Sequence, residues 1–445
     1  MQVGAALAKL LGEQGNVFEV KPHDGNGGPE PGRQVAQLVS RAERSSDVVL
    51  LTAEVPSNAD AGKAVEWTRS CIREADRIVV VARADDAAIA PIDEHHVVDL
   101  LVVGGQPLLP RLHEWLDVLS PKSHWYADRE PTTSQLTPLA RSLTGRSVAL
   151  VLSGGGARGF AHVGLLQELD AAGIVVDRYA GTSMGAYVGA LAANGLEPGE
   201  IHERLRRNFA ERNPLGDITL PVIALSRGMR GRAIVEASFG ELEIEQLPRP
   251  FFCMTVDLMA GEAVVHDRGW LAAAVGASMS IPGLVPPVPL GDRRLVDGGF
   301  LNNLPVDHMI DRADGPVVGC DVIAELKVRV GGEARIPTPW RRSRLADTAA
   351  RLPKLGSRVL GRGVRMALTG QGEPLPTLPA VLGRVVNLSG RASSEANGRL
   401  ADVLVQPRVS DIGVFEFARI DEAVERGRVA GRKALEDSGH LLGAG

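Results

Sequence analysis

The stretch Val148–Ala190 constrains the fold most, because it reads as a strand, a glycine turn, a helix, a short strand and a second glycine turn that opens another helix. Its first apolar run, Ala149–Leu152, is typical of a strand buried on both faces. The glycines that follow, Gly154–Gly156, can bring bare backbone N–H groups close to a negative charge. The second turn, Gly181–Gly185, has the G-x-S-x-G form, in which Ser183 occupies a sharp strand-to-helix bend with an exposed hydroxyl. The stretch therefore predicts an α/β fold that holds an anion cradle and a nucleophile.

The composition excludes several classes of function. The 445 residues are enough for two or three domains, and a formal net charge of −5 gives no argument for a nucleic-acid partner. Three scattered cysteines predict neither a disulfide framework nor a zinc site and favour a reducing compartment. No secretory signal and no membrane-spanning apolar stretch is visible, so we expect a cytoplasmic protein. No His, Asp or Glu cluster has ligand spacing along the sequence, and no metal is predicted.

Residues 1–130 alternate helical and strand patterns. The apolar runs Asp47–Leu51, Arg77–Ala82 and Val98–Val103 read as strands, with helical patterns between them. This alternation implies a parallel sheet with helices on its faces, so we predict a Rossmann-like α/β domain. No glycine-rich loop ending in Lys-Ser/Thr occurs here, and no nucleoside triphosphate chemistry is predicted. Because the chain starts directly with a helix, we expect a strand to be missing upstream.

The rest of the chain divides into three parts. Residues 131–146 follow a polar, turn-rich stretch and are predicted to be a linker. Residues 147–325 repeat the α/β alternation and contain the nucleophile turn, so we assign them to a catalytic domain. Residues 326–445 are predicted to be a C-terminal extension with a late strand at Asp402–Val405 and a terminal helix at Ile420–Leu435.

A basic segment, Lys327–Arg365, opens this extension. It contains eleven Lys or Arg residues against two acids, with apolar residues between them. A solvated insertion is the interpretation that this composition favours. The alternative is peripheral contact with an anionic membrane, at the inner face, through the basic side chains and the interleaved apolar residues.

Ser183 needs a base that can take its proton. Ser278 is a weaker candidate nucleophile, because its turn lacks the closing glycine and prolines follow it. Among the candidate bases, His308 lies in an ordinary helix pattern, and His162 reads as a structural histidine near the start of a helix. Asp297 lies on a glycine-flanked turn at the end of a strand, and a carboxylate whose pKa is raised by desolvation can act as a base. The local pattern fits a turn-forming aspartate equally well.

The glycine loop Gly154–Gly159 also satisfies G-x-G-x-x-G, and Asp177 ends the next strand. Together these are close to a dinucleotide-binding fingerprint. Arg158 within the loop and the serine turn at Ser183 argue against a dinucleotide-dependent oxidoreductase. We keep that function as the less favoured alternative.

Four motifs in order carry a resemblance to a known family. They are GGGARG at Gly154–Gly159, GTSMG at Gly181–Gly185, the stretch Ala277–Gly283, and DGG at Asp297–Gly299. With these motifs the chain resembles the patatin-like phospholipase family, and more narrowly the bacterial relatives of neuropathy target esterase. The resemblance implies a patatin-type three-layer α/β/α hydrolase domain over residues 147–325, preceded by the Rossmann-like domain.

The same resemblance implies a function and a set of site residues. It implies that Ser183 is the nucleophile and Asp297 its partner, in a dyad without histidine that needs no cofactor or metal. The implied reaction is hydrolysis of carboxylic esters in phospholipids or lysophospholipids, and a non-catalytic lipid-binding scaffold is the alternative. The implied oxyanion hole comprises Gly154, Gly155, Gly156 and Arg158, and the implied elbow and turn residues are Gly181, Gly185, Gly298 and Gly299.

Overall fold

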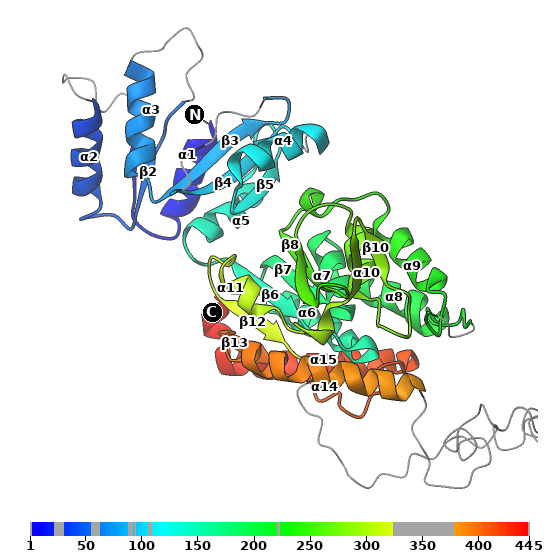
Figure 1. Ribbon diagram of the computed structural model, residues 1–445. Helices are drawn as coiled ribbons and strands as arrows, with labels where there is room; N and C mark the ends of the chain where they lie inside the picture. The colour runs from blue at the N-terminus through cyan, green and yellow to red at the C-terminus, as the bar shows by residue number, and fades with distance from the viewer. Residues whose placement is uncertain are drawn as a thin grey trace, which may run out of the picture.

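The structure is a computed structural model that describes residues 2–21, 31–54, 63–87, 92, 95–105, 109–219, 223–323 and 378–443. The basic segment Lys327–Arg365 lies outside these residues. The described chain forms two α/β parts that lie side by side, an N-terminal part and a larger part that follows it (Figure 1). None of the described helices is both long enough and apolar enough to cross a bilayer.

The N-terminal part alternates strands and helices as the sequence predicts. Its strands form two separate parallel sheets, β1-β2 and β3-β4-β5. The α/β alternation is therefore present, whereas a Rossmann-like arrangement as such stays a prediction. The elements are α1 (Gln2–Gly12), β1 (Val17–Val20), α2 (Pro31–Ala42), β2 (Val48–Leu51), α3 (Lys63–Glu74), β3 (Arg77–Arg83), β4 (Val97–Val103), α4 (Leu109–Leu119), β5 (Ser123–Ala127) and α5 (Thr133–Leu143).

Residues 131–146, predicted as a linker, instead contain α5. Thr132 caps this helix in a capping box, accepting from the Gln135 amide while the Gln135 side chain accepts from the Thr132 amide. Leu136 and Leu139 are fully buried in the N-terminal core. The polar residues that suggested a linker are the cap and the exposed face of a helix, so that prediction was wrong.

The second part is built on one mixed sheet of order β10-β11-β8-β7-β6-β12-β13. The five strands from β8 to β13 in this order are parallel. Its elements are β6 (Val148–Leu152), η2 (Gly156–Phe160), α6 (Ala161–Ala171), β7 (Val176–Thr182), α7 (Met184–Ala193), α8 (Pro198–Leu205), η3 (Arg206–Glu211), α9 (Met229–Phe239), η4 (Ile244–Gln246), β8 (Phe251–Asp257), β9 (Glu262–His266), α10 (Leu271–Ser278), β10 (Val288–Leu290), β11 (Arg293–Asp297), η5 (Gly298–Phe300), α11 (Val306–Ile310), β12 (Val317–Cys320), α14 (Leu378–Gly398), β13 (Val403–Val405), η8 (Phe417–Arg419), α15 (Ile420–Ser438) and η9 (Gly439–Leu442).

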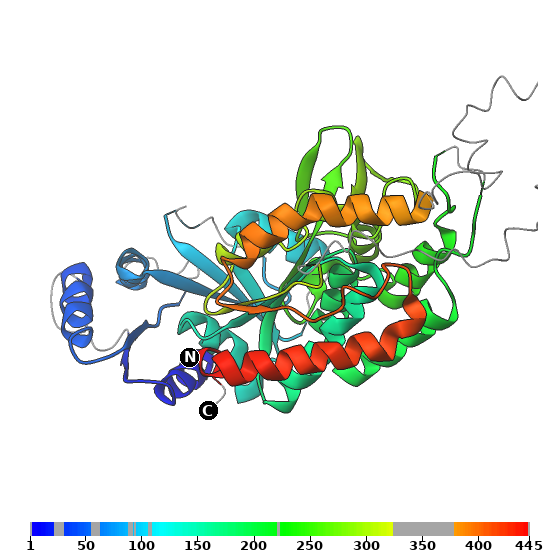
Figure 2. The same ribbon diagram turned by 90° about the horizontal axis from the view of Figure 1, so that it is seen from below.

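Strand β6 shows why this part has three layers. Its residues alternate between two cores: Leu150 and Leu152 pack with the buried residues of α6, α7 and α15, and Val151 packs with those of α11. All five residues of β6 are buried, as expected for a parallel strand covered by helices on both faces. Seen from below, α14 and α15 lie on opposite sides of the sheet (Figure 2).

One edge of β8 is shared by two strands. β7 pairs with this edge as far as Met254, which lies opposite Thr182. β11 takes over at the next residue, because Thr255 lies opposite Asp297. β9 pairs with the other edge of β8 along the same residues. The chain therefore leaves β7 toward α7 at the point of the sheet where β11 ends.

The C-terminal extension belongs to the same fold. β13 adds to the sheet beside β12, and α15 packs along α6. The helices approach closely because glycines face each other: a Cβ on Gly427 would lie 1.9 Å from the Ala161 carbonyl oxygen, and one on Gly164 would lie 2.0 Å from that of Val424. Residues 402–443 are thus packed into the second α/β part.

A carboxylate joins the two α/β parts. Asp314, which precedes β12, accepts hydrogen bonds from Arg77 at 3.1 and 3.2 Å and from Lys122 at 2.6 Å. Burial opposes ionisation of Asp314, but the hydrogen bonds from Lys122 and Ser142 and the nearby charges hold its pKa below the ordinary value. The contact therefore favours the ionised carboxylate.

We predict that Gly427→Ala separates α15 from α6 and destabilises the protein by at least about 2 kcal/mol, since backbone must move to admit the methyl group. Gly199→Ala is the matched control, because Gly199 is exposed and a Cβ there meets no atom within 4 Å. The control should change stability by less than about 1 kcal/mol. Thermal or urea unfolding of both variants tests this, and equal stability would contradict the close helix packing.

Candidate active site

Ser183 lies between β7 and α7 in a conformation that serine rarely adopts, with φ 54° and ψ −121°. Such backbone conformations typically cost about 1–3 kcal/mol and are held in place by their surroundings. A Cβ on Gly185 would lie 2.2 Å from the Leu152 carbonyl oxygen, so only glycine lets α7 approach the end of β6 this closely. The G-x-S-x-G turn of the sequence is therefore a strand-to-helix elbow.

The Ser183 hydroxyl donates a hydrogen bond to Oδ2 of Asp297 at 2.6 Å. The other carboxylate oxygen of Asp297 accepts from the Gly299 amide at 2.8 Å, which fixes the orientation of the side chain. Asp297 is 1% exposed. Burial raises its pKa to about 6, although the hydrogen bonds from Ser183 and Gly299 act to lower it. Its environment thus gives it a proton affinity well above that of an ordinary aspartate.

Ser278 supports the backbone of the elbow through a hydrogen bond to the Ser183 amide. Its hydroxyl accepts a hydrogen bond from the Ser183 amide at 2.8 Å and donates one to the Met254 carbonyl at 2.7 Å. From the sequence, Ser278 was a candidate only for a second nucleophile. Its fully buried position and two backbone contacts make it a support for Ser183 instead.

The two histidines considered as bases lie elsewhere. His162 is buried, with Nε2 2.8 Å from the Ser153 carbonyl oxygen and Nδ1 3.2 Å from Cys320 Sγ. Burial lowers its pKa to about 4. His308 lies on α11 with its side chain 37% exposed. Among the described residues, no histidine makes a hydrogen bond to Ser183.

The glycine loop lies directly against the nucleophile. A Cβ on Gly154 would be 3.0 Å from that of Ser183. The Gly154 amide donates to the Asn303 carbonyl at 3.3 Å. Gly156 has φ 56° and lines the same cavity as Ser183. Within the described part of the chain, we find no hydrogen-bond acceptor for the amides of Gly155 and Gly156.

Arg158, which the resemblance places at the oxyanion hole, contacts the C-terminal segment. Its guanidinium Nε donates to the Ile412 carbonyl at 2.7 Å, and its amide donates to the Gly155 carbonyl. Nearby, the Ala157 amide donates to the Val414 carbonyl at 2.8 Å. The side chain of Arg158 thus joins the glycine loop to the C-terminal segment.

The position of Asp177 argues against a dinucleotide-binding site. Asp177 is buried, with Oδ2 accepting from the Val148 amide at 2.9 Å and pairing with Arg141 at 3.1 Å. A ribose-binding carboxylate must face a ligand, and this one is engaged within the fold.

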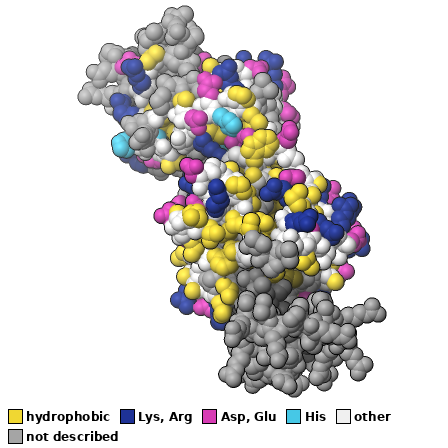
Figure 3. Space-filling view, turned by 45° about the vertical axis from the view of Figure 1, so that its right-hand side comes forward, with side chains coloured by type: hydrophobic (Ala, Val, Ile, Leu, Met, Phe, Trp, Pro, Cys, Tyr) yellow, Lys and Arg dark blue, Asp and Glu magenta, His cyan; other side chains and the backbone are white. Residues whose placement is uncertain are grey.

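A cavity of about 530 Å³ opens beside Ser183. This volume lies within the range of about 300–1,000 Å³ that is typical of small-molecule sites. The same part of the molecule presents a broad area of hydrophobic side chains on one face, beside a cluster of basic ones (Figure 3). The apolar lining of the cavity could not be identified from the sequence, because it comes from separate elements. It includes Met184, Phe209, Val235, Trp270, Met279, Ile281, Leu284, Val285, Val288, Phe415 and Phe417.

Comparison with known proteins identifies this site's family. Residues 150–310 match the Patatin-like phospholipase family model. This range begins in β6 and ends with α11, and it includes the glycine loop, Ser183 and Asp297.

Relatives extend the match beyond that domain. An uncharacterized NTE family protein of Mycobacterium tuberculosis is 37% identical over 409 residues, which cover 92% of this chain and 64% of the relative. The chain therefore spans somewhat less than two thirds of that relative's length. A lysophospholipase nte1 of Aspergillus niger is 30% identical over 328 residues, covering 71% of this chain and 20% of the relative.

Among solved structures, VipD from Legionella pneumophila matches with a TM-score of 0.35 and 15% identity, over 66% of this chain and 67% of that one. A likeness this distant supports no conclusion. The sequence relatives and the family match agree with the order of the motifs and with the three-layer fold. The chain is thus similar to NTE family proteins over most of its length, and residues 150–310 match the patatin-like phospholipase family.

Proposed function

We propose that the protein hydrolyses acyl esters of phospholipids or lysophospholipids through a Ser183–Asp297 dyad. The observation that carries the proposal is the 2.6 Å hydrogen bond from the Ser183 hydroxyl to a buried carboxylate, at the wall of a largely apolar cavity. A nucleophile next to a base whose proton affinity is raised is the arrangement that acyl transfer requires.

In the first half of the reaction, Asp297 takes the proton of Ser183 as Oγ attacks the ester carbonyl. The tetrahedral intermediate collapses, and the leaving alcohol takes that proton from Asp297. In the second half, a water molecule gives its proton to Asp297 and attacks the acyl-enzyme. The fatty acid leaves, Ser183 regains the proton, and the dyad returns to its starting state.

The developing oxyanion needs preorganised N–H donors. We propose the amides of Gly155 and Gly156, because neither has an acceptor among the described residues and Gly156 lines the cavity. The amide of Met184, the first residue of α7, is a further candidate at the positive end of the helix dipole. Gly154 and Arg158 are better suited to hold the loop, because their groups are engaged within the fold.

The apolar lining of the cavity favours a lipid substrate rather than a small polar ester. An apolar lining favours an acyl chain through burial of about 25 cal/mol per Å² of apolar surface. The fungal relatives bear the name lysophospholipase, which agrees with this class of substrate.

We further propose that residues 1–130 form a Rossmann-like domain with a structural role, joined to the hydrolase part through Asp314. Peripheral contact with anionic membranes through Lys327–Arg365 is also a proposal. It predicts that the protein co-sediments with anionic liposomes at low salt and dissociates as salt screens the charges. Binding that neither salt nor replacement of those basic residues weakens would contradict it.

We predict that Ser183→Ala abolishes labelling by a fluorophosphonate probe and release of fatty acid from lysophosphatidylcholine, because the attacking oxygen is removed. His308→Ala should keep both, since His308 lies on α11 and makes no contact with Ser183 among the described residues. Full labelling of Ser183→Ala would place the nucleophile elsewhere. A wild type that binds lipid but neither labels nor releases fatty acid would instead indicate a binding scaffold.

The pKa of about 6 for Asp297 predicts the pH dependence of the reaction. The base works only as a carboxylate, so kcat/KM should fall about tenfold per pH unit below pH 6 and level off above it. Asp297→Asn should lower kcat by several orders of magnitude above pH 6, and the difference from the wild type should narrow in acid. An acid limb centred near pH 4 in the wild type would contradict the assignment of Asp297 as a desolvated base.

The same pKa has an effect on stability. Because burial raises the pKa of Asp297 in the folded state, this residue favours folding fully below its unfolded pKa of 3.8, and that contribution is lost as the pH rises through about 6. We therefore predict that Asp297→Asn, while inactive, raises the free energy of unfolding at pH 8 by up to about 3 kcal/mol. The gain should vanish near pH 3, and urea unfolding at both pH values measures it.

A further inference from the structure

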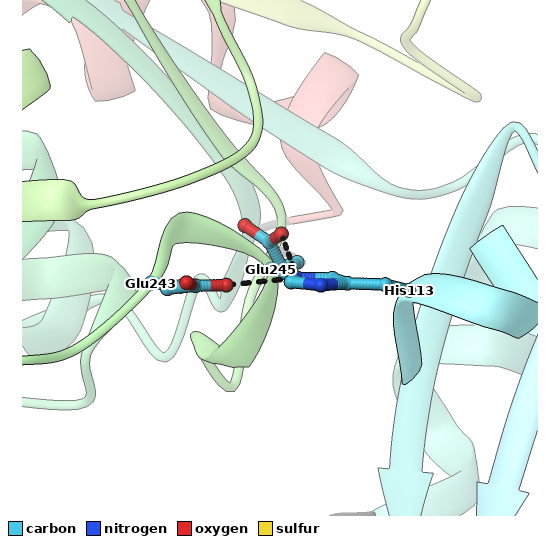
Figure 4. A group of neighbouring side chains, drawn as sticks. All are labelled: His113, Glu243 and Glu245. Carbon is cyan, nitrogen blue, oxygen red and sulfur yellow. Dashed lines mark hydrogen bonds and ion pairs between the residues drawn. The ribbon is translucent and has the colours of Figure 1, made fainter. Parts of the chain in front are cut away.

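Three potential metal ligands meet where the two α/β parts touch (Figure 4). His113 comes from α4 of the N-terminal part, and Glu243 and Glu245 come from the start of η4 in the hydrolase part. The His113 Nε2 atom lies 2.9 Å from Glu243 Oε2 and 2.9 Å from Glu245 Oε1. Among the described residues, this is the one group of three such side chains whose ligand atoms all lie within 4.8 Å.

The hydrogen bonds from His113 do not neutralise the negative charge of the two glutamates. The side chains of Glu243 and Glu245 are only 10% and 2% exposed. A single ring nitrogen carries at most one proton, so it can offer one N–H to two carboxylates. Within the described chain, no lysine or arginine forms an ion pair with either glutamate. Two buried negative charges therefore face at most one positive charge, an arrangement that is unfavourable without another cation.

Backbone groups orient both carboxylates toward the histidine. Glu245 Oε2 accepts from the Gly269 amide at 2.7 Å, which leaves Oε1 facing His113. Glu243 caps η4, with its side chain accepting from a backbone amide of the first turn. Partners of this kind commonly fix the orientation of metal ligands. The cluster thus has an orienting shell as well as three ligands.

We propose that His113, Glu243 and Glu245 bind a divalent cation, with Zn²⁺ the best match. Zinc takes imidazole nitrogen and carboxylate oxygen ligands at about 2.0–2.2 Å. The His113 nitrogen lies 2.9 Å from each carboxylate oxygen. Ligands of a tetrahedral zinc ion lie about 3.3–3.5 Å apart, so the side chains would have to separate by only about half an ångström to admit the ion. His113 is 43% exposed, which gives the ion an entry path and leaves room for water at the remaining position. One divalent cation and a neutral imidazole would balance the two carboxylates.

The bound ion would join the two parts of the chain. Around it, the Glu245 carbonyl accepts from His124 and from Tyr126 Oη, each at 2.7 Å, and both donors lie on β5. The Gly269 amide binds the Glu245 carboxylate, and the next residue, Trp270, lines the cavity. The site goes beyond the proposed hydrolysis, which involves none of its residues, and it gives the N-terminal part a metal-dependent attachment.

Zinc binding to the full chain tests the proposal. After treatment with a chelator, the wild type should bind one equivalent of Zn²⁺ with a Kd of about 1 μM or tighter, measured by competition with a chromophoric indicator. His113→Ala and Glu245→Gln should weaken binding at least about 100-fold, since each removes a ligand. Zinc should also raise the unfolding temperature of the wild type and not of these variants.

His202→Ala is the matched control, because His202 pairs at 3.0 Å with a single exposed carboxylate, that of Asp421, and should not contribute a site. Fluorophosphonate labelling of Ser183 in each variant reports that the hydrolase part is folded, independently of zinc. Loss of zinc binding in His202→Ala as well, equal affinity in His113→Ala, or no binding by the wild type would overturn the proposal and leave an ion-paired contact without metal.

Discussion

The site depends on the way in which β7 and β11 pair with successive residues on the same edge of β8. β7 ends at Thr182 opposite Met254, and β11 delivers Asp297 opposite Thr255, one residue further along. The residue that follows Thr182 therefore meets Asp297 without any long side chain reaching across the site. Hydrogen bonding of the sheet, rather than a flexible loop, sets the 2.6 Å contact. Sites built on regular elements hold their geometry with little reorganisation.

This arrangement combines two unfavourable features that the surrounding fold must support. Ser183 has a strained backbone, and Asp297 has a buried carboxyl group. Ser278 holds the strained amide, and the Gly299 amide holds the carboxylate. The loop opposite them is tied to the C-terminal segment through Val414. Each support comes from a different part of the chain, which is the usual way in which strain at functional sites is maintained.

The sequence was sufficient for features that depend on neighbouring residues. The buried strands, the elbow at Ser183 and the end of β11 at Asp297 follow from apolar runs and glycine turns. Features that depend on distant residues could not be predicted. Ser278 contacts the elbow only because α10 packs behind it, and His113 meets Glu243 only after two parts of the chain come together.

Two predictions about the chain after residue 130 depend on contacts that the local sequence does not show. The polar residues near 131–146 were interpreted as a linker, although Thr132 and its neighbours cap a helix whose other face is buried. Residues 326–445 were assigned to an extension with a late strand and a terminal helix, which are present as β13 and α15. Nothing in the local pattern of Val403–Val405 indicates that β12 is the partner of this strand. Pairing between strands that are far apart in sequence has no local signature.

The position of β13 has a consequence for how the protein is made. Its partner β12 ends at Cys320, and β13 begins at Val403, so the parallel sheet closes across a long intervening segment. α15, which covers one face of this sheet, follows later still. During synthesis at about 5–20 residues per second, the central strands must wait several seconds for these elements to leave the ribosome. Until then the edge of β12 is unpaired and the apolar face of α6 is uncovered, the kind of surface that chaperones bind. The nascent chain therefore exposes these surfaces after Ser183 and Asp297 have been made and before its last helix has emerged.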